Sequence, residues 1–214
     1  MTFDIPVLIL ARKGSKRIKD KNIVDFCGKP LIVHAIEKAL KVSKNVYVSS
    51  NSQKILDLSK SSGARCLIRP ENLCYDTSSS VDGVLHFFEV KKYNDVCLLQ
   101  VTAPLIRASH ILEGIKKYKN KKYDSVISAY KKKVFIWDHM RNPLNFSIKT
   151  RNRTQEHDYV FVENGGFYIS SLSHLKKNLT FFSGNVGFCE IEERYSVDID
   201  NYEDLKIAKL MSGA

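Results

Sequence analysis

The chain has 214 residues, of which 43% are hydrophobic, so it is long enough to bury the core of one domain and too apolar to be disordered throughout. Its formal net charge of +11 permits nucleic acid, an anionic membrane face or small anionic substrates as partners, and charge alone does not choose among them. The apolar run near the start is too short for a membrane span and breaks at Arg12, so we expect a cytoplasmic protein without a membrane span.

Short apolar runs rich in β-branched residues alternate with segments of helical periodicity through most of the chain. Strands are predicted at 5–10, 45–50, 64–69, 95–101 and 124–130, and helices at 30–40, 53–63, 81–93 and 109–119. Such alternation is typical of right-handed βαβ units. The sequence therefore predicts an α/β fold with a mostly parallel sheet and helices on both faces.

The alternation stops after Tyr130. Residues 131–160 are rich in charged and aromatic side chains and have no clean helical face, so we expect an arm of hairpins and loop there. The strand pattern returns at 164–171, and a last helix is expected after Asp200. Because no linker or repeat divides the chain, we expect residues 1–214 to form a single domain that carries this arm.

The five cysteines show neither the paired spacing of a zinc site nor that of a disulfide framework. We therefore expect free and buried thiols. The positions concerned are Cys27, Cys66, Cys74, Cys97 and Cys189.

A strongly basic loop, in the stretch LILARKGSKRIKDKNI at 8–23, follows the first predicted strand. Ligands of open α/β sheets bind at the carboxyl ends of strands. The loop lacks the ending of a Walker A motif and has one glycine where a dinucleotide-binding fingerprint has three. Its composition favours phosphate binding by backbone N–H groups near Gly14 and Ser15, with charge-assisted bonds from Arg12 and Lys21. A solvated basic turn is the alternative.

The segment SVDID places Asp198 and Asp200 two residues apart on an extended stretch, so both carboxylates point to one face. Mg²⁺ held by one or two carboxylates and by substrate oxygens is the natural occupant of such a pair. The alternative is that Asp200 or Asn201 caps the last helix, with Asp204 completing a capping box.

Three further motifs have both a local and a functional interpretation. The Asn164–Gly165 dipeptide is typical of a hairpin turn, but the asparagine amide is also suited to bind a polyol. Gln100 ends a predicted buried strand, where it faces either ligand or core. The Ser/Thr cluster that follows Arg69 predicts a helix cap at Thr77 or Ser78.

Taken in order, six motifs resemble those of the acylneuraminate cytidylyltransferases, the CMP-sialic acid synthetases. They are LILARKGSKRIKDKNI, CGKPLIVHAI, RPENLCYDTSSSVDGV, LLQVTAPLIRASHI, ENGGFYI and YSVDIDNYEDL, and they span essentially the whole chain. The resemblance implies a Rossmann-like, doubly wound fold of the nucleotide-sugar transferase type and a homodimer with 131–160 as a dimerisation arm that covers substrate. It also implies Mg²⁺ and the reaction of CTP with an acidic nine-carbon sugar to give a CMP-sugar and pyrophosphate.

The resemblance assigns expected roles to individual residues. The phosphate-binding loop matches Arg12, Ser15, Lys21 and Asn22, and the cytidine side matches Arg69 and Ser80. The sugar side matches Gln100, Asn164, Tyr168, Phe181 and Phe182, and the metal ligands match Asp198 and Asp200. The expected catalytic residues are Arg12, Lys21, Asp198 and Asp200.

Departures from the family pattern, such as Val162 and Gly166, leave the identity of the sugar open. N-acylneuraminate is favoured, and pseudaminic, legionaminic or another ulosonic acid is the alternative. A basic RNA-binding domain is a remote alternative, suggested by the lysine-rich stretch at 116–123, but it leaves Asp198, Asp200 and Gln100 unexplained. We therefore expect no nucleic-acid partner.

Overall fold

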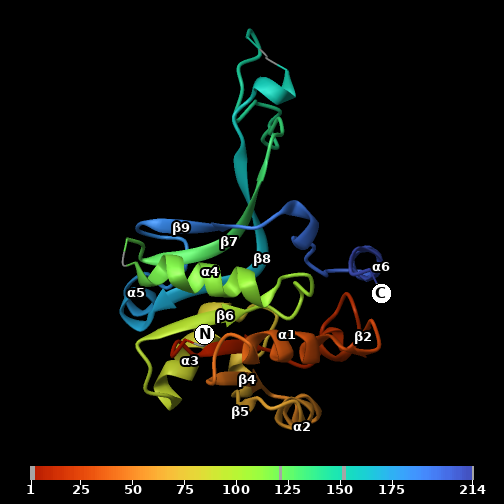
Figure 1. Cartoon of the computed structure of the whole chain (residues 1–214), viewed down its shortest axis with the longest axis vertical. Coiled ribbons are helices and arrows are strands. Elements are labelled where there is room, and N and C mark those ends of the chain that lie inside the picture. Colours follow the sequence, from red (N-terminus) through yellow and green to blue (C-terminus); the bar gives the residue numbers. More distant parts are fainter. Residues whose placement is uncertain (1–2, 121, 151–152, 214) are drawn as a thin grey trace.

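A computed structural model describes residues 3–120, 122–150 and 153–213, and a seven-stranded sheet forms its centre (Figure 1). In the order in which they lie, the strands are β5 (Arg65–Ile68), β4 (Val46–Ser50), β1 (Val7–Leu10), β6 (Asp95–Leu99), β8 (Val160–Ser171), β7 (Ser125–Lys132) and β9 (Val186–Glu190). β8 pairs antiparallel with both neighbours, and every other pair in the sheet is parallel. The prediction of a mostly parallel sheet is confirmed.

Helices cover both faces of this sheet. One face carries α1 (Leu31–Leu40), α2 (Gln53–Ser61), α4 (Ala108–Lys119) and α6 (Tyr202–Met211), and the other carries α3 (Ser80–Val90) and α5 (Leu172–Asn178). Both faces are covered because successive side chains of a strand such as β1 point to opposite faces of the sheet, and each face carries apolar residues. Val7 and Ile9 join the core cluster under α1 and α4, whereas Leu8 joins the cluster under α3 and α5. The doubly wound architecture is therefore confirmed.

The long connection between β7 and β8 extends away from the sheet as an arm (Figure 1). Its base is a continuation of the β7–β8 ladder, in which Lys132 pairs with Val160. Beyond the ladder, the Phe146 ring packs edge-on against Phe135 and Trp137, with ring centroids 4.9 and 5.0 Å apart. The arm thus has a small aromatic cluster of its own.

Some elements were not anticipated. The strand β9, the helix α5 and a short hairpin of β2 (Asp25–Phe26) and β3 (Lys29–Pro30) all lie where no element was predicted. The cysteines are free, as expected, but the expectation of burial is wrong for Cys66, which is exposed on the edge strand β5, and for Cys27, which is half-buried. Among the described helices, none has the length and apolar character needed to cross a bilayer.

Candidate active site

The candidate site lies at the switch point of the sheet, where the chain passes from β1 to β4 on one side and later returns to β6 on the other. Ligands of doubly wound sheets bind outside the carboxyl ends of the strands at such a point. Arg12, Arg69 and Gln100 each come one or two residues after one of these strands, namely β1, β5 and β6. The fold thus brings residues from three distant motifs to one edge.

The basic loop after β1 is fixed to the domain at several points. Ile18 is fully buried in the core, and the Asn22 side chain donates a hydrogen bond to the carbonyl oxygen of Arg12 at 2.9 Å. Gly14 has φ +81°, a left-handed conformation that favours glycine. Ser15 is half-buried beside it. The loop is therefore a held structure rather than a free basic turn.

Carboxylates from the segment after β5 pair with the cations of this loop. One oxygen of Asp76 lies 2.5 Å from the Arg12 guanidinium, and the other lies 2.5 Å from the ammonium of Lys16. The ammonium of Lys13 lies 3.1 Å from a carboxylate oxygen of Glu71. Hydrogen bonds from Lys16 and Arg12 lower the pKa of Asp76 despite some desolvation. Sequence reasoning missed both acids, although they stand in the same RPENLCYD motif that drew attention to Arg69.

The far end of the basic loop contacts the SVDID segment. Lys21 donates to the carbonyl oxygen of Ile199 at 2.8 Å and lies 3.2 Å from Asp200 Oδ1, while Arg17 lies 2.9 Å from Asp200 Oδ2. Partial burial alone would raise the pKa of Asp200, but hydrogen bonds and charge from Lys21 and Arg17 together lower it. The cap of α6 is Asn201, which forms a reciprocal box with Asp204. The Asp200 carboxylate is thus left to face the loop.

Asp198 lies beside Gly165, and a Cβ atom added there would come within 2.8 Å of Asp198 Oδ2. The side chain keeps contact with solvent, yet surrounding atoms remove part of its hydration. This desolvation raises the pKa of Asp198, and the negative charge of Asp200 raises it further, against a hydrogen bond from Thr102. The two carboxylates are therefore close enough to repel each other.

Such a pair fits a divalent cation, because the cation would relieve this repulsion. No group of three or more His, Cys, Asp or Glu side chains gathers as a metal cluster in the described part of the chain. An ion held by Asp198 and Asp200 would therefore take its other ligands from substrate and water, as Mg²⁺ commonly does.

Asn164 lies inside β8, so the expectation of a hairpin turn at Asn164–Gly165 is wrong. The pairing of β7 with β8 slips at this point, between Ile127 and Ala129. Ser128 Oγ donates to Asn164 Oδ1 at 2.6 Å, and Asn164 Nδ2 donates to Ser196 Oγ at 3.0 Å. The Asn164 side chain is thus buried and holds a β-bulge in place. Its contact with a sugar stays a prediction.

A cavity of about 310 Å³ lies on the α3–α5 face of the sheet. Five of the predicted site residues share its lining, namely Ser80, Gln100, Tyr168, Phe181 and Phe182. The Tyr168 ring lies with its centroid 5.4 Å from that of Phe181 and 5.9 Å from that of Phe182. Phe181 is buried in the core, whereas Phe182 is 56% exposed. Phe181 thus packs in the core, whereas Phe182 forms a cavity wall that is open to solvent.

Tyr168 donates a hydrogen bond from its hydroxyl group to the carboxylate of Glu163, an acid that sequence reasoning missed. Desolvation, this hydrogen bond and the negative charges of Glu163 and Asp198 raise the pKa of Tyr168. Asp198 lies against Gly165, which stands in β8 between Glu163 and Tyr168, so the carboxylate pair lies near the cavity.

Arg69 is buried, and its Nε and Nη2 atoms have no hydrogen-bond partner within the described structure. Desolvation lowers its pKa, and the positive charge of Arg12 lowers it further. A buried cation with unpaired donors is costly, which indicates that a ligand completes its hydrogen bonds. The helix that follows is capped by Ser79, which forms a box with Asp82, so the expectation of a cap at Thr77 or Ser78 is wrong.

The lysines at the base of the arm pair with groups of the same chain. Lys131 pairs with Glu190, Lys132 with Glu193, and Lys133 donates to the carbonyl oxygen of Gln155. The cavity beside Tyr168 has no arm lysine in its lining.

The fold and this edge define a nucleotidyltransferase-type α/β protein. The chain matches the model of the cytidylyltransferase family over residues 6–207, and it belongs to that family. Two solved structures share the fold. One is CMP:2-keto-3-deoxy-manno-octonic acid synthetase complexed with CTP, with a TM-score of 0.76, 16% identity and 99% of each chain covered. The other is 4-diphosphocytidyl-2C-methyl-D-erythritol synthase from Anaerococcus prevotii, with a TM-score of 0.67, 13% identity and 99% of each chain covered.

Curated relatives are similar over most of this chain. N-acylneuraminate cytidylyltransferase B of Danio rerio is 33% identical over 94% of this chain and 50% of its own length. Pseudaminic acid cytidylyltransferase of Campylobacter jejuni is 28% identical over 95% of this chain and 94% of its own length. The chain spans about half the length of the first of these relatives.

Proposed function

We propose that this chain is a cytidylyltransferase that joins CTP to an acidic nine-carbon sugar, giving the CMP-sugar and pyrophosphate. The observation that carries the proposal is that Asp198 lies against Gly165 in the strand of Tyr168, while Asp200 lies 3.2 Å from Lys21 of the basic loop. A cationic loop suited to a triphosphate thus adjoins a cavity suited to a small polar molecule with an apolar substituent.

N-acylneuraminate is the favoured sugar. The names of the relatives from Danio rerio support it, and Phe182 provides an apolar wall for an acyl group. Pseudaminic acid or a related ulosonic acid is the second candidate, because a pseudaminic acid cytidylyltransferase matches this chain over 94% of its own length.

The proposed reaction is in-line attack of the anomeric hydroxyl of the sugar on the α-phosphorus of CTP, with pyrophosphate leaving and the hydroxyl proton passing to water. Arg12 and Lys21 bind the phosphates and stabilise the charge that grows on the leaving pyrophosphate. The buried Arg69 and the exposed Ser80 hold the cytidine, and Gln100 and Tyr168 orient the sugar. When bound by Asp198 and Asp200, Mg²⁺ would supply Lewis-acid polarisation of the reacting oxygens.

We also propose that the arm at 131–160 makes a homodimer and that the protein acts in the cytoplasm. Large apolar side chains on the arm support the dimer, since Trp137, Met140, Leu144 and Ile148 are 49–70% exposed. Exposed apolar side chains gathered on one segment commonly mark an interface. Light scattering of the chain, and of a variant with Trp137→Ser and Leu144→Ser, would measure this assembly; a wild-type monomer would contradict it.

Pyrophosphate release with the four nucleoside triphosphates and a panel of ulosonic acids tests the reaction. We expect release with CTP and at least one nine-carbon acid, and its loss in Asp200→Ala. Glu203→Gln is a matched control, because Glu203 is exposed on the first turn of α6 and lies outside the carboxylate pair. Wild-type activity of Asp200→Ala at saturating Mg²⁺ would contradict the role given to Asp200.

A further inference from the structure

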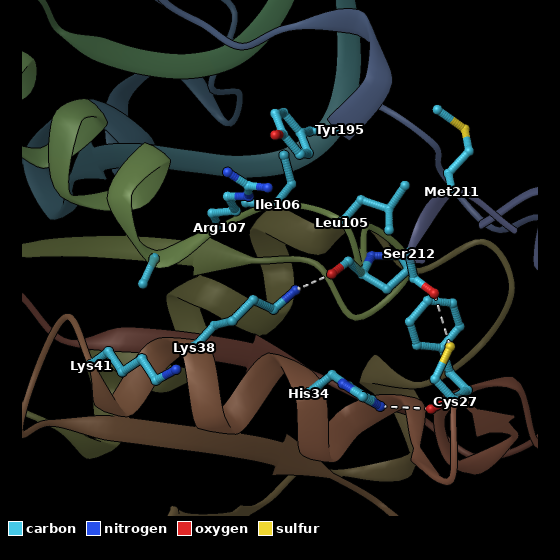
Figure 2. A pocket seen from close by; sticks show the side chains of 13 residues that line it. Cys27, His34, Lys38, Lys41, Leu105, Ile106, Arg107, Tyr195, Met211 and Ser212 are labelled. Atoms are coloured by element: carbon cyan, nitrogen blue, oxygen red, sulfur yellow. Dashed lines mark hydrogen bonds between the residues drawn. The ribbon is translucent and has the colours of Figure 1, made fainter. Parts of the chain in front are cut away.

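A second cavity, of about 470 Å³, lies on the other face of the sheet (Figure 2). It is bounded by α1, by the loop between β6 and α4, by the 3-10 turn Glu193–Tyr195 and by the end of α6. The cavity beside Tyr168 lies under α3 and α5 instead. The two cavities are therefore separated by the sheet, and the second one is no extension of the candidate active site.

The lining of the second cavity is cationic. Lys38 and Lys41 enter it from α1 and Arg107 from the opposite side, with His34 nearby, and none of its 13 lining residues is Asp or Glu (Figure 2). The basic loop differs in this respect, because Arg12, Lys13 and Lys16 are paired with carboxylates of the chain. Three cationic side chains and no acid among the lining residues make the cavity a place of positive potential.

Two of these cations, Lys38 and Arg107, are held in place by uncharged groups. Lys38 donates to the carbonyl oxygens of Ala103 and Pro104 at 3.3 and 2.9 Å, and Arg107 stacks 4.2 Å above the Tyr195 ring. Burial lowers the pKa of Lys38 to about 7. An anion in the cavity would offset this cost of desolvation, because opposite charge favours the protonated amine.

The remaining wall is apolar and is formed by Leu105, Ile106, Met211 and the ring of Tyr195. A cavity with apolar walls and a few converging polar groups is typical of a site for a small molecule. The positive end of the cavity suits an oxyanion, and its apolar wall suits the organic group to which the oxyanion is attached.

We propose that this cavity is a second ligand site, which binds a small phosphate monoester with an apolar carrier. Lys41 and Arg107 contact the phosphate, and the Tyr195 wall covers the carrier. The site does not depend on the proposed cytidylyl transfer.

Cys27 reports on occupancy, because its thiol lines the cavity and is half-buried, whereas Cys66 is exposed and lies outside it. The full chain is alkylated with iodoacetamide, and each cysteine is followed by mass spectrometry. Phenyl phosphate is expected to slow the alkylation of Cys27 in a saturable way and to leave Cys66 unchanged. Inorganic phosphate should bind more weakly, and phenol should not protect.

Lys41→Gln with Arg107→Gln is expected to weaken the protection by about tenfold or more, as for the loss of charge-assisted hydrogen bonds. The control variant Lys54→Gln with Lys60→Gln removes the same charge from exposed positions on α2 and should leave the protection of Cys27 unchanged. Arg12→Gln should also leave the protection of Cys27 unchanged, and this result would distinguish binding in the second cavity from binding at the basic loop. Lys41→Gln alone, checked by circular dichroism, serves if the double variant unfolds.

Three results would overturn the proposal. The first is wild-type Cys27 that reacts equally with and without phenyl phosphate. The second is protection that survives in the folded Lys41→Gln, Arg107→Gln variant. The third is a Cys27 that is unreactive in the native chain without ligand, which would mean that the cavity is closed in solution.

Discussion

The ammonium of Lys21 lies 3.2 Å from a carboxylate oxygen of Asp200, and it also donates to the carbonyl oxygen of Ile199 at 2.8 Å. These contacts join the loop after β1 to a segment 178 and 179 residues further along the chain. The Lys21 side chain is 15% exposed, so solvent screens the contact less than it would on an open surface. The proposed phosphate-binding residue Lys21 and the expected metal ligand Asp200 are thus positioned as one unit.

Lys21→Gln should remove this link and one phosphate donor. We expect turnover to fall by about 10²–10³-fold, the usual cost of losing one group that stabilises transition-state charge. Pyrophosphate release under saturating CTP measures it. Lys19→Gln is the matched control, because Lys19 is exposed on the same loop, and equal activities of the two variants would contradict the role of Lys21.

Asp76→Asn should free Arg12 and Lys16, which Asp76 holds at 2.5 Å each. A triphosphate must displace this carboxylate, so we expect CTP to bind about two- to fivefold more tightly, as partly exposed ion pairs contribute about 0.2–1 kcal/mol. Titration calorimetry without sugar measures the affinity. Glu89→Gln, exposed on α3, controls for the lost charge. Weaker CTP binding by Asp76→Asn would mean that Asp76 positions Arg12 for the nucleotide.

Gly165→Ala should disturb both backbone and site. Gly165 has φ +61°, and its Cβ would lie 2.8 Å from Asp198 Oδ2. Gly14 has φ +81° with nothing within 4 Å of its Cβ, so Gly14→Ala carries the backbone strain alone. Urea unfolding should show a loss of about 1–2 kcal/mol for Gly14→Ala and a larger loss for Gly165→Ala. Equal losses would contradict the close approach of Asp198.

Lys38→Met should remove a pH dependence of stability. Burial lowers the pKa of Lys38 in the folded state to about 7 from the ordinary value of 10.5, so folding disfavours its proton. Below about pH 7 both states carry the proton and the folded state bears the full cost of burial, whereas above about pH 10.5 neither carries it. The stability of the wild type relative to Lys38→Met should therefore rise between these values. A constant difference between the two unfolding free energies from pH 6.5 to 9.5 would contradict it.

The sequence predicted the alternating core because its strands and helices each carry a full hydrophobic period. It missed α5 and β9, which are short and are separated by the exposed turn around Gly184. The dipeptide at Asn164 gave the signal of a hairpin, but a hydrogen bond from Ser128, 36 residues away, makes it a bulge.

The predicted residues Ser80, Gln100, Tyr168 and Phe181 do share one cavity. The acids that pair with the loop were missed for a physical reason. Asp76 meets Arg12 across 64 residues and Glu71 meets Lys13 across 58, and no local periodicity encodes such distant ion pairs. The charge pattern of the sequence therefore predicts an anion site at the loop, but it does not predict which carboxylates of the chain pair with the loop.

The most direct test of the central claim is mass spectrometry of the nucleotide product formed from CTP and each of several ulosonic acids. The account predicts a CMP-sugar and one equivalent of pyrophosphate with at least one nine-carbon acid, and no corresponding product from ATP, GTP or UTP. The absence of CTP-dependent turnover with every acid, by a folded and Mg²⁺-supplied chain, would contradict it.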